Sequence, residues 1–279
     1  MMKRQQSSGG AAVKAVIFDW AGTTVDFGSI APVHAMAAVF KNARVPVSSE
    51  EIRRPMGLDK RRHIEEMLRD GEIARRWRAV HHANSTEQDV DGLFDAFNER
   101  LIEIVPRHAD PVPGLLDVIA VLRAANMKIG SNSGYSARVM DVLSRAARNR
   151  GFAPDCIVSS SDVIAGRPAP DLSLKCMDEL GLDGESVAIK VDDTPVGIHE
   201  GRSAGLWTVA VAISGNEVGL SLEEWLALTD EQRAGLRNHA YERLRRSFPD
   251  YVIDTVADLT PVVEHIEIRV AAGERRRAW

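Results

Sequence analysis

VIFDWAGTTVDFG, residues 16–28, leads a short apolar run into Asp19 and then into a turn rich in glycine and threonine. A carboxylate at the mouth of a buried strand, followed by such a turn, is typical of a nucleophile for phosphoryl transfer. Many sites of this kind carry a second acid two residues later, which gives a proton to the leaving group. Ala21 occupies that position here, so another group must activate the leaving group.

The composition indicates a soluble globular protein with a large core. The chain has 279 residues, 44% of them hydrophobic and 27% charged, which allows one large domain or two moderate ones. A net charge of −5 gives no support for binding to nucleic acid or to a membrane surface. Cys156 and Cys176 lack the spacing of a disulfide framework or a zinc site. Residues 1–12 are polar, lack the apolar core of a secretory signal and predict a flexible tail on a cytoplasmic protein.

Short runs rich in β-branched residues alternate with helical patterns along most of the chain. Within residues 113–127, Leu115, Ile119 and Leu122 recur at helical spacing and predict a helix. This alternation predicts an α/β fold with a Rossmann-like parallel sheet covered by helices. The predicted strands are residues 13–20, 127–133, 156–163, 186–193, 207–214 and 251–256.

Residues 30–106 interrupt the alternation with successive helical patterns and no convincing strand. The predicted helices cover residues 32–45, 60–83 and 89–105. A helical insert between the first two core strands favours a cap that covers the substrate, and a purely structural subdomain is the alternative. We therefore predict a flexible tail (1–12), a core domain (13–29 and 107–279) and a helical cap domain (30–106).

Four motifs place polar residues near the ends of predicted strands, where ligands bind in parallel sheets. They are DWAGTTVD (19–26), GSNSG (130–134), GRPAPD (166–171) and KVDDTPVGIHEGRSAG (190–205). In this order and spacing they resemble the motifs of the haloacid dehalogenase superfamily over nearly the whole core. The resemblance implies an enzyme that transfers a phosphoryl group through an aspartyl-phosphate.

Each motif supplies a group that phosphoryl transfer needs. Asp19 is the expected nucleophile. Ser133 is expected to donate to a phosphoryl oxygen, together with the backbone N–H groups of Gly134 and Tyr135. Arg167 is expected to supply positive charge beside the nucleophile and the phosphoryl group.

The same resemblance implies a Mg²⁺ site made of oxygen ligands. We expect Asp19, Asp193 and the Ala21 carbonyl to hold the ion, because Mg²⁺ prefers oxygen ligands and retains several waters. Many superfamily members carry a further acid four residues after the position of Asp193, and Gly197 stands there in this chain. Asp192 is the expected replacement, either as a carboxylate ligand or as a hydrogen-bond acceptor for metal-bound water.

A narrower resemblance concerns the phosphonoacetaldehyde hydrolase (phosphonatase) branch. That branch shares DWAGT with alanine at position 21, and it shares the cap motif that reads PMGLDKRRH in residues 55–63. GYS (134–136), AGRP (165–168), KVDDT (190–194) and EGRSAGLWTV (200–209) also match. The resemblance implies a small phosphonate substrate whose leaving group is carbon, which gains little from a nearby acid and needs an electron sink instead.

In this branch a cap lysine condenses with the substrate aldehyde, and Lys60 matches that lysine. Its amine must be partly neutral, so its pKa must be lowered by burial or by nearby cations. Arg61 and Arg62 are candidate cations, whereas Asp59 would oppose the shift. Met56 and His63 match the positions that line the lysine.

His63, three residues after Lys60 on the predicted helix, shares roughly its face and is expected to relay protons. The branch also pairs through cap helices, which implies a homodimer. An apolar stripe made of Val33, Met36, Ala37 and Phe40 serves either that contact or packing inside the cap. Two other functions stay open: a phosphatase-like hydrolase or paralogue with another phosphonate or phosphate substrate, and a catalytically silent binding protein.

Overall fold

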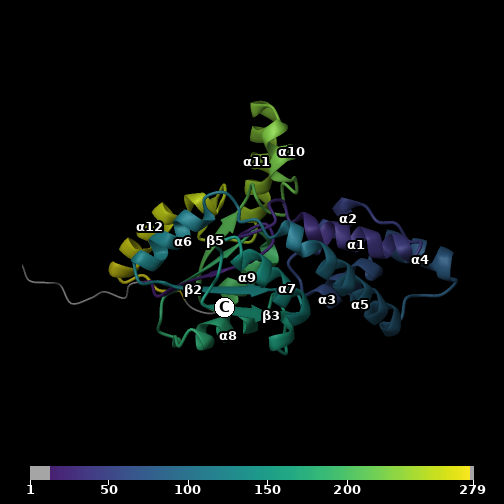
Figure 1. Cartoon of the computed structure of the whole chain (residues 1–279), viewed down its shortest axis with the longest axis horizontal. Coiled ribbons are helices and arrows are strands. Elements are labelled where there is room, and N and C mark those ends of the chain that lie inside the picture. The colour runs from purple at the N-terminus through teal and green to yellow at the C-terminus, as the bar shows by residue number, and fades with distance from the viewer. Residues whose placement is uncertain (1–12, 277–279) are drawn as a thin grey trace, which may run out of the picture.

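The computed structural model describes residues 13–276, and the predicted tail (1–12) lies outside them. Six parallel strands form one sheet in the order β3-β2-β1-β4-β5-β6, as Figure 1 shows. The strands are β1 (Ala15–Phe18), β2 (Lys128–Ser133), β3 (Cys156–Ser159), β4 (Ala188–Asp192), β5 (Trp207–Val211) and β6 (Tyr251–Ile253). The predicted α/β class, the six predicted strands and their parallel arrangement are confirmed.

Alternating side chains on β1 build two separate layers of core. Val16 and Phe18 pack with residues of α6 (Leu115–Ala124), α7 (Ala137–Arg148) and α12 (Leu259–Ala271). Ala15 and Ile17 pack instead with α8 (Asp171–Glu179), and α9 (Pro195–Ser203) lies beside α8 against β4 and β5. Because successive strand residues point to opposite faces, a strand buried on both faces is apolar throughout, as β1 is.

β1 lies at the point where the chain changes direction across the sheet. The chain runs outward from β1 through β2 to β3, then returns to the other side of β1 for β4, β5 and β6. Ligands in open α/β sheets bind beyond the carboxyl ends of strands at such a point. Asp19, directly after β1, is therefore at the place where the topology favours a site.

Of the six α-helices between β1 and β2, the five before α6 extend to one side of the sheet (Figure 1). They are α1 (Ile30–Asn42), α2 (Ser49–Arg53), α3 (Lys60–Arg69), α4 (Gly71–His81) and α5 (Glu87–Ile104). The single helix predicted for residues 60–83 is wrong, because Asp70 ends α3 and its carboxylate accepts from the N–H groups of Glu72 and Ile73 to begin α4. The prediction also missed α2, which Ser48 and Glu51 begin with a capping box.

The apolar stripe of α1 is packed inside this helical segment. Val33, Met36 and Phe40 are buried, Ala37 packs against the same cluster, and α1 contacts α5 along its length. The stripe is thus not an exposed surface for a second subunit, so of the two readings the sequence left open, packing inside the cap is the correct one.

The remaining elements connect those already described. They are α10 (Leu222–Ala227) and α11 (Asp230–Arg245), which project from the core in Figure 1, and the 3-10 turns η1 (Val105–His108), η2 (Ser160–Asp162) and η3 (Val256–Asp258). Within residues 13–276, none of the helices combines the length and the apolar character that a membrane crossing requires.

Candidate active site

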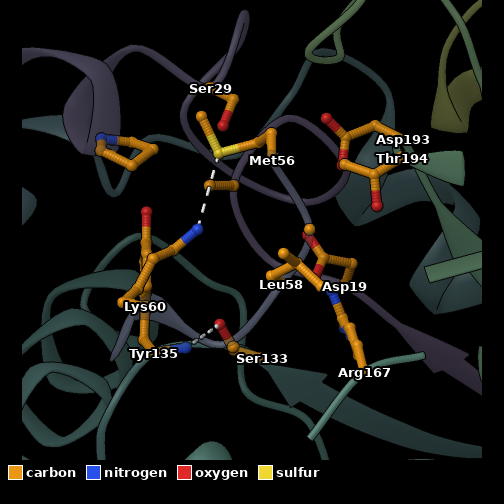
Figure 2. Close-up of a pocket in the computed structure, with 14 residues that line it drawn as sticks. Asp19, Ser29, Met56, Leu58, Lys60, Ser133, Tyr135, Arg167, Asp193 and Thr194 are labelled. Atoms are coloured by element: carbon orange, nitrogen blue, oxygen red, sulfur yellow. Dashed lines mark hydrogen bonds and ion pairs between the residues drawn. The ribbon is translucent and has the colours of Figure 1, made fainter. Parts of the chain in front are cut away.

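One cavity collects most of the residues that the sequence singled out, at the carboxyl ends of β1, β2 and β4 (Figure 2). The predicted residues that line it are Asp19, Ala21, Met56, Lys60, Ser133, Gly134, Tyr135, Arg167 and Asp193. Lys60 begins α3, whereas Asp19 follows β1. The helical segment and the sheet therefore each contribute one side of the same cavity.

Asp19 and Arg167 form a buried ion pair. The Arg167 Nη1 atom lies 2.8 Å from Asp19 Oδ1, and only 2% of the arginine side chain is exposed. Among the described residues, Asp19 Oδ2 makes no hydrogen bond or ion pair. Burial, and then the charge of Asp192, raise the pKa of Asp19 to about 6, although Arg167 opposes the shift. The Asp19 carboxylate is thus held through Oδ1, and Oδ2 is left without a partner in the described part of the chain.

Three buried carboxylates lie close together, as in sites that bind a metal cation. One oxygen from each of Asp19, Asp192 and Asp193 lies within 4.8 Å of the other two. Burial, followed by the charges of Asp19 and Asp192, raises the pKa of Asp193 well above its ordinary value. Its Oδ2 accepts from the backbone N–H of Asn216 at 2.7 Å. A buried carboxylate with this environment fits a hard cation such as Mg²⁺, which takes oxygen ligands.

Asp192 differs from its neighbour because its charge is already neutralised. Oδ1 accepts from the N–H and the hydroxyl of Thr194, and Oδ2 lies 3.1 Å from Lys190 Nζ and 3.4 Å from Arg167 Nη1. Burial alone would raise the pKa of Asp192, but Arg167 and Lys190 outweigh it and hold this pKa below its usual value. Asp192 does not line the cavity, so its place is that of a charge partner behind the other two acids.

Gly197 is explained by the position of Asp192. A Cβ atom at Gly197 would lie 2.0 Å from Cγ of Asp192. The carboxylate of Asp192 therefore fills the space in which a side chain at position 197 would begin. The acid at position 192 and the glycine at position 197 thus depend on each other, because the Asp192 carboxylate leaves no room for a side chain at position 197.

Ser133 ends β2 with its hydroxyl beside the cavity. Its Oγ accepts from the backbone N–H of Tyr135 at 3.1 Å, which leaves the hydroxyl proton of Ser133 to donate toward a ligand. The predicted N–H donor at Tyr135 is therefore already engaged. The absence of a side chain at Gly134 lets the backbone of Leu58 approach closely, since a Cβ at Gly134 would lie 2.7 Å from the carbonyl oxygen of Leu58.

Lys60 is buried and only 5% exposed. Its Nζ lies 3.5 Å from Met56 Sδ and 5.7 Å from the centre of the Tyr135 ring, as Figure 2 shows. Burial lowers its pKa to about 8, with a further contribution from Arg167, while Asp19 and Asp59 oppose the shift. The site thus holds an amine that is partly neutral near physiological pH.

The charged residues beside Lys60 cap α3 or pair with acidic residues of α5, and none of them forms a hydrogen bond or ion pair with the lysine amine. Asp59 is the N-cap of α3 and accepts from the N–H of Arg62 at 3.0 Å. Arg61 pairs outward with Glu87 and Asp91 at 2.6 and 2.8 Å. The cation that lowers the pKa of Lys60 is Arg167, so the expectation for Arg61 and Arg62 is wrong.

His63 is fully buried but does not line the cavity. Its Nε2 lies 2.9 Å from the carbonyl oxygen of Ile52, and a carbonyl can only accept, so Nε2 carries the proton. Burial, followed by the charge of Lys60, lowers the pKa of His63 well below its ordinary value. The neutral imidazole supports the segment behind Lys60 and makes no direct contact in the cavity.

Several residues of the site were missed from the sequence. Ser29, Pro32, Gly57, Leu58 and Thr194 also line the cavity. Leu58 and Gly57 fall within the motif of residues 55–63, which could have indicated them. Asn216 and Glu200 contact Asp193 and Arg167 respectively, and only the motif around Glu200 gave a signal in advance.

Comparison with known proteins places these features in a family. The model of the haloacid dehalogenase-like hydrolases matches residues 13–205. A phosphonoacetaldehyde hydrolase of Hahella chejuensis is 46% identical over 261 residues, 94% of this chain and 89% of the relative. One from Vibrio cholerae is 44% identical over 265 residues, 94% of this chain and 98% of the relative.

The solved structures agree with this placement. A phosphonoacetaldehyde hydrolase-like protein from Oleispira antarctica superposes with a TM-score of 0.93 at 41% identity, covering 99% of this chain and 100% of that one. A β-phosphoglucomutase from Clostridium difficile, with a TM-score of 0.67 at 17% identity over 94% and 98% of the two chains, shares the fold. The chain is a haloacid dehalogenase-like hydrolase. Within that class it belongs to the phosphonoacetaldehyde hydrolase family.

Replacing Gly197 by Ala should destabilise the protein because the new methyl group overlaps Asp192. We expect a loss of about 1–3 kcal/mol in the free energy of unfolding, as for other overpacked sites, measured by urea denaturation. Gly235→Ala is the matched control, since Gly235 is also helical and has nothing within 4 Å of an added Cβ; it should gain about 0.5–1 kcal/mol. Equal effects at the two positions would contradict the overlap.

Mg²⁺ should stabilise the folded protein through Asp193. At about 100 times its Kd, a ligand that binds only the folded state adds about 2.7 kcal/mol, seen as a rise in Tm by calorimetry. Asp193→Asn should remove most of this response, because the buried carboxylate that faces the cavity is lost. Asp178→Asn, at an exposed position of α8, should retain the full response. A response that survives in Asp193→Asn would place the ion elsewhere.

Proposed function

We propose that the protein hydrolyses the C–P bond of phosphonoacetaldehyde to give acetaldehyde and phosphate. One observation carries this proposal: a buried lysine with a pKa of about 8 faces the same cavity as a carboxylate nucleophile that has alanine two residues later. The names of the relatives supply the substrate. Phosphate esters would need a proton donor at Ala21 and would leave Lys60 without a task.

The first step joins the substrate aldehyde to Lys60. The neutral amine attacks the carbonyl carbon, and loss of water with uptake of one proton from solvent gives a protonated imine. Burial beside Met56 and the ring of Tyr135 keeps the amine poorly solvated, which favours its neutral form. Burial likewise raises the pKa of Tyr135 well above its ordinary value, so its hydroxyl stays protonated next to the forming imine.

The second step moves the phosphoryl group to Asp19. Oδ2 attacks phosphorus, the C–P bond breaks, and its electron pair flows into the iminium to give a neutral enamine. Arg167 and the hydroxyl of Ser133 bind phosphoryl oxygens during the transfer. Water then cleaves the aspartyl-phosphate, and the enamine is protonated on carbon and hydrolysed to acetaldehyde, which frees Lys60.

Mg²⁺ fits beside this machinery. We assign its ligands to Asp19, Asp193 and the carbonyl of Ala21, with Asp192 as a neutralised neighbour. Bound there, the ion would offset the negative charge shared by the carboxylates and the phosphoryl group. Asn216 and Thr23 hold Asp193 in place through hydrogen bonds at 2.7 and 3.4 Å.

In this mechanism the two predicted domains contribute different groups. Residues 13–29 and 107–279 form the core that carries Asp19 and the metal ligands, and residues 30–106 form the cap that carries Lys60. Contacts such as Leu58 against Gly134 support a cap that covers the bound substrate. We retain the cytoplasmic setting and the homodimer as proposals, the latter without the stripe of α1.

Lys60→Arg should abolish acetaldehyde release from phosphonoacetaldehyde in the presence of Mg²⁺. Arginine retains the charge but cannot form an imine, so the electron sink is lost. Lys175→Arg is the control, because that lysine is partly exposed and pairs with Glu179, and it should behave as wild type. Acetaldehyde release is measured by a coupled dehydrogenase assay. Full activity in Lys60→Arg would exclude the imine mechanism.

Imine formation should follow the lowered pKa of Lys60. In metal-free protein, borohydride trapping of acetaldehyde on Lys60 should rise as the pH passes about 8 and level off above it. A lysine at its ordinary value of about 10.4 would still gain neutral amine well beyond that point. Mass spectrometry of the labelled peptide measures the product, with Lys60→Arg as the blank. A midpoint near the ordinary value would contradict the buried position of the amine.

A further inference from the structure

A second layer of ionised groups lies behind Asp19 and is not explained by the steps above. Lys190 points from β4 to the face of the sheet that α8 and α9 cover, and Glu200 comes from α9. Both are fully buried. Burying charge is costly unless each group is paired and hydrogen-bonded, so the arrangement needs a reason beyond packing.

The guanidinium of Arg167 is held from three directions. Nε donates to Glu200 Oε2 at 2.7 Å, and Nη2 donates to Asn132 Oδ1 at 2.6 Å. These two contacts leave Nη1 to face the carboxylate of Asp19. A planar guanidinium fixed on two sides cannot rotate, so the direction of its third side is set from behind.

Glu200 is itself held in place. Its other oxygen, Oε1, accepts from the hydroxyl of Ser173 at 2.5 Å and from Nδ2 of Asn132 at 2.8 Å. Lys190 Nζ donates to Asn132 Oδ1 at 2.5 Å and lies 3.7 Å from Glu200 Oε2. Glu200 thus accepts three hydrogen bonds through its two oxygens, and its carboxylate is fixed relative to β2 and α8.

We propose that Glu200 is a positioning residue that aims Arg167 at the phosphoryl group during transfer to Asp19. It touches neither substrate nor nucleophile. Without its negative charge, the Nε side of Arg167 is released, and the guanidinium can turn to bind both oxygens of Asp19. That bidentate pair would engage Oδ2, the oxygen that attacks phosphorus. The assignment rests on the proposed function, because it gives Arg167 its task there.

The test separates the two chemical steps in Glu200→Gln. Glutamine retains the size but has one accepting oxygen for three donors. We expect kcat for acetaldehyde release to fall by about 10²-fold, the scale of a small misplacement of a reacting group. Borohydride trapping of the substrate imine on Lys60 should stay within about twofold of wild type, because Arg167 keeps its charge beside the cavity and takes no direct part in forming the imine. Glu179→Gln, at an exposed position in α8, should leave both readouts unchanged.

A double-mutant cycle distinguishes positioning from general structural damage. Arg167→Lys removes the Nε atom, so adding Glu200→Gln to it should lower kcat little further. If Glu200→Gln lowers kcat equally in both backgrounds, or if imine trapping falls together with kcat, the proposal is overturned. Should Glu200→Gln fail to fold, Glu200→Asp retains the charge but withdraws the carboxylate by one methylene. A folded Glu200→Asp with wild-type kcat would also overturn it.

Failure of the proposed function can be recognised separately. Wild type would then show neither imine trapping nor acetaldehyde release. In that case, Mg²⁺-dependent binding of beryllofluoride, an analogue of a phosphoryl group on Asp19, reports the position of Arg167 directly. Weaker binding to Glu200→Gln by about 10²-fold would support the positioning role on the scale of a misplaced reacting group, and equal binding to both proteins would exclude it.

Discussion

The burial of several carboxylates at the carboxyl ends of β1 and β4 is the constraint on which the rest of the site depends. Asp19, Asp192 and Asp193 lie together without solvent to screen them. Arg167 and Lys190 neutralise Asp192 and part of the charge of Asp19. Asp193 makes no ion pair among the described residues and lines the cavity, so its charge faces the place where a divalent ion and a phosphoryl group are proposed to bind.

The same low-dielectric environment shifts the pKa values of Asp19 and Lys60 in opposite directions. Burial raises the pKa of Asp19 and lowers that of Lys60, because it disfavours the charged form of each. Lys60 is also the first residue of α3, where the positive end of the helix dipole disfavours a further positive charge. Arg167 acts on both groups: it offsets part of the rise in the pKa of Asp19 and further lowers the pKa of the Lys60 amine. One buried cation therefore favours an ionised Asp19 and a neutral Lys60 in one cavity, as the proposed mechanism requires.

The sequence predicted the sheet and most of the cavity, because both depend on local patterns. Apolar runs ending in Asp19 and Ser133 indicate strands, and parallel strands bring their carboxyl ends to one edge. The break at Asp70 and the burial of the α1 stripe depend on how the helices pack against each other, which periodicity does not record. Lys190 likewise lowers the pKa of Asp192 only because both side chains are buried together, and burial depends on the tertiary structure. The spacing of two residues in a strand places Lys190 and Asp192 on one face, but it does not show that both side chains are buried there.

The helical segment and Asp193 both contact one loop of the core, which contains Asn216. Arg53, in α2, donates to Asn216 Oδ1 at 3.1 Å and to the carbonyl oxygen of Gly219 at 3.0 Å. Asn216 in turn donates its backbone N–H to Asp193 and its side-chain amide to the carbonyl oxygen of Arg53. The position of the segment that carries Lys60 and the orientation of Asp193 are therefore fixed by the same residue. The hydrogen bonds of Asn216 couple the position of α2 to the orientation of Asp193, since a shift of α2 would break its contacts with Asn216, which holds Oδ2 of Asp193.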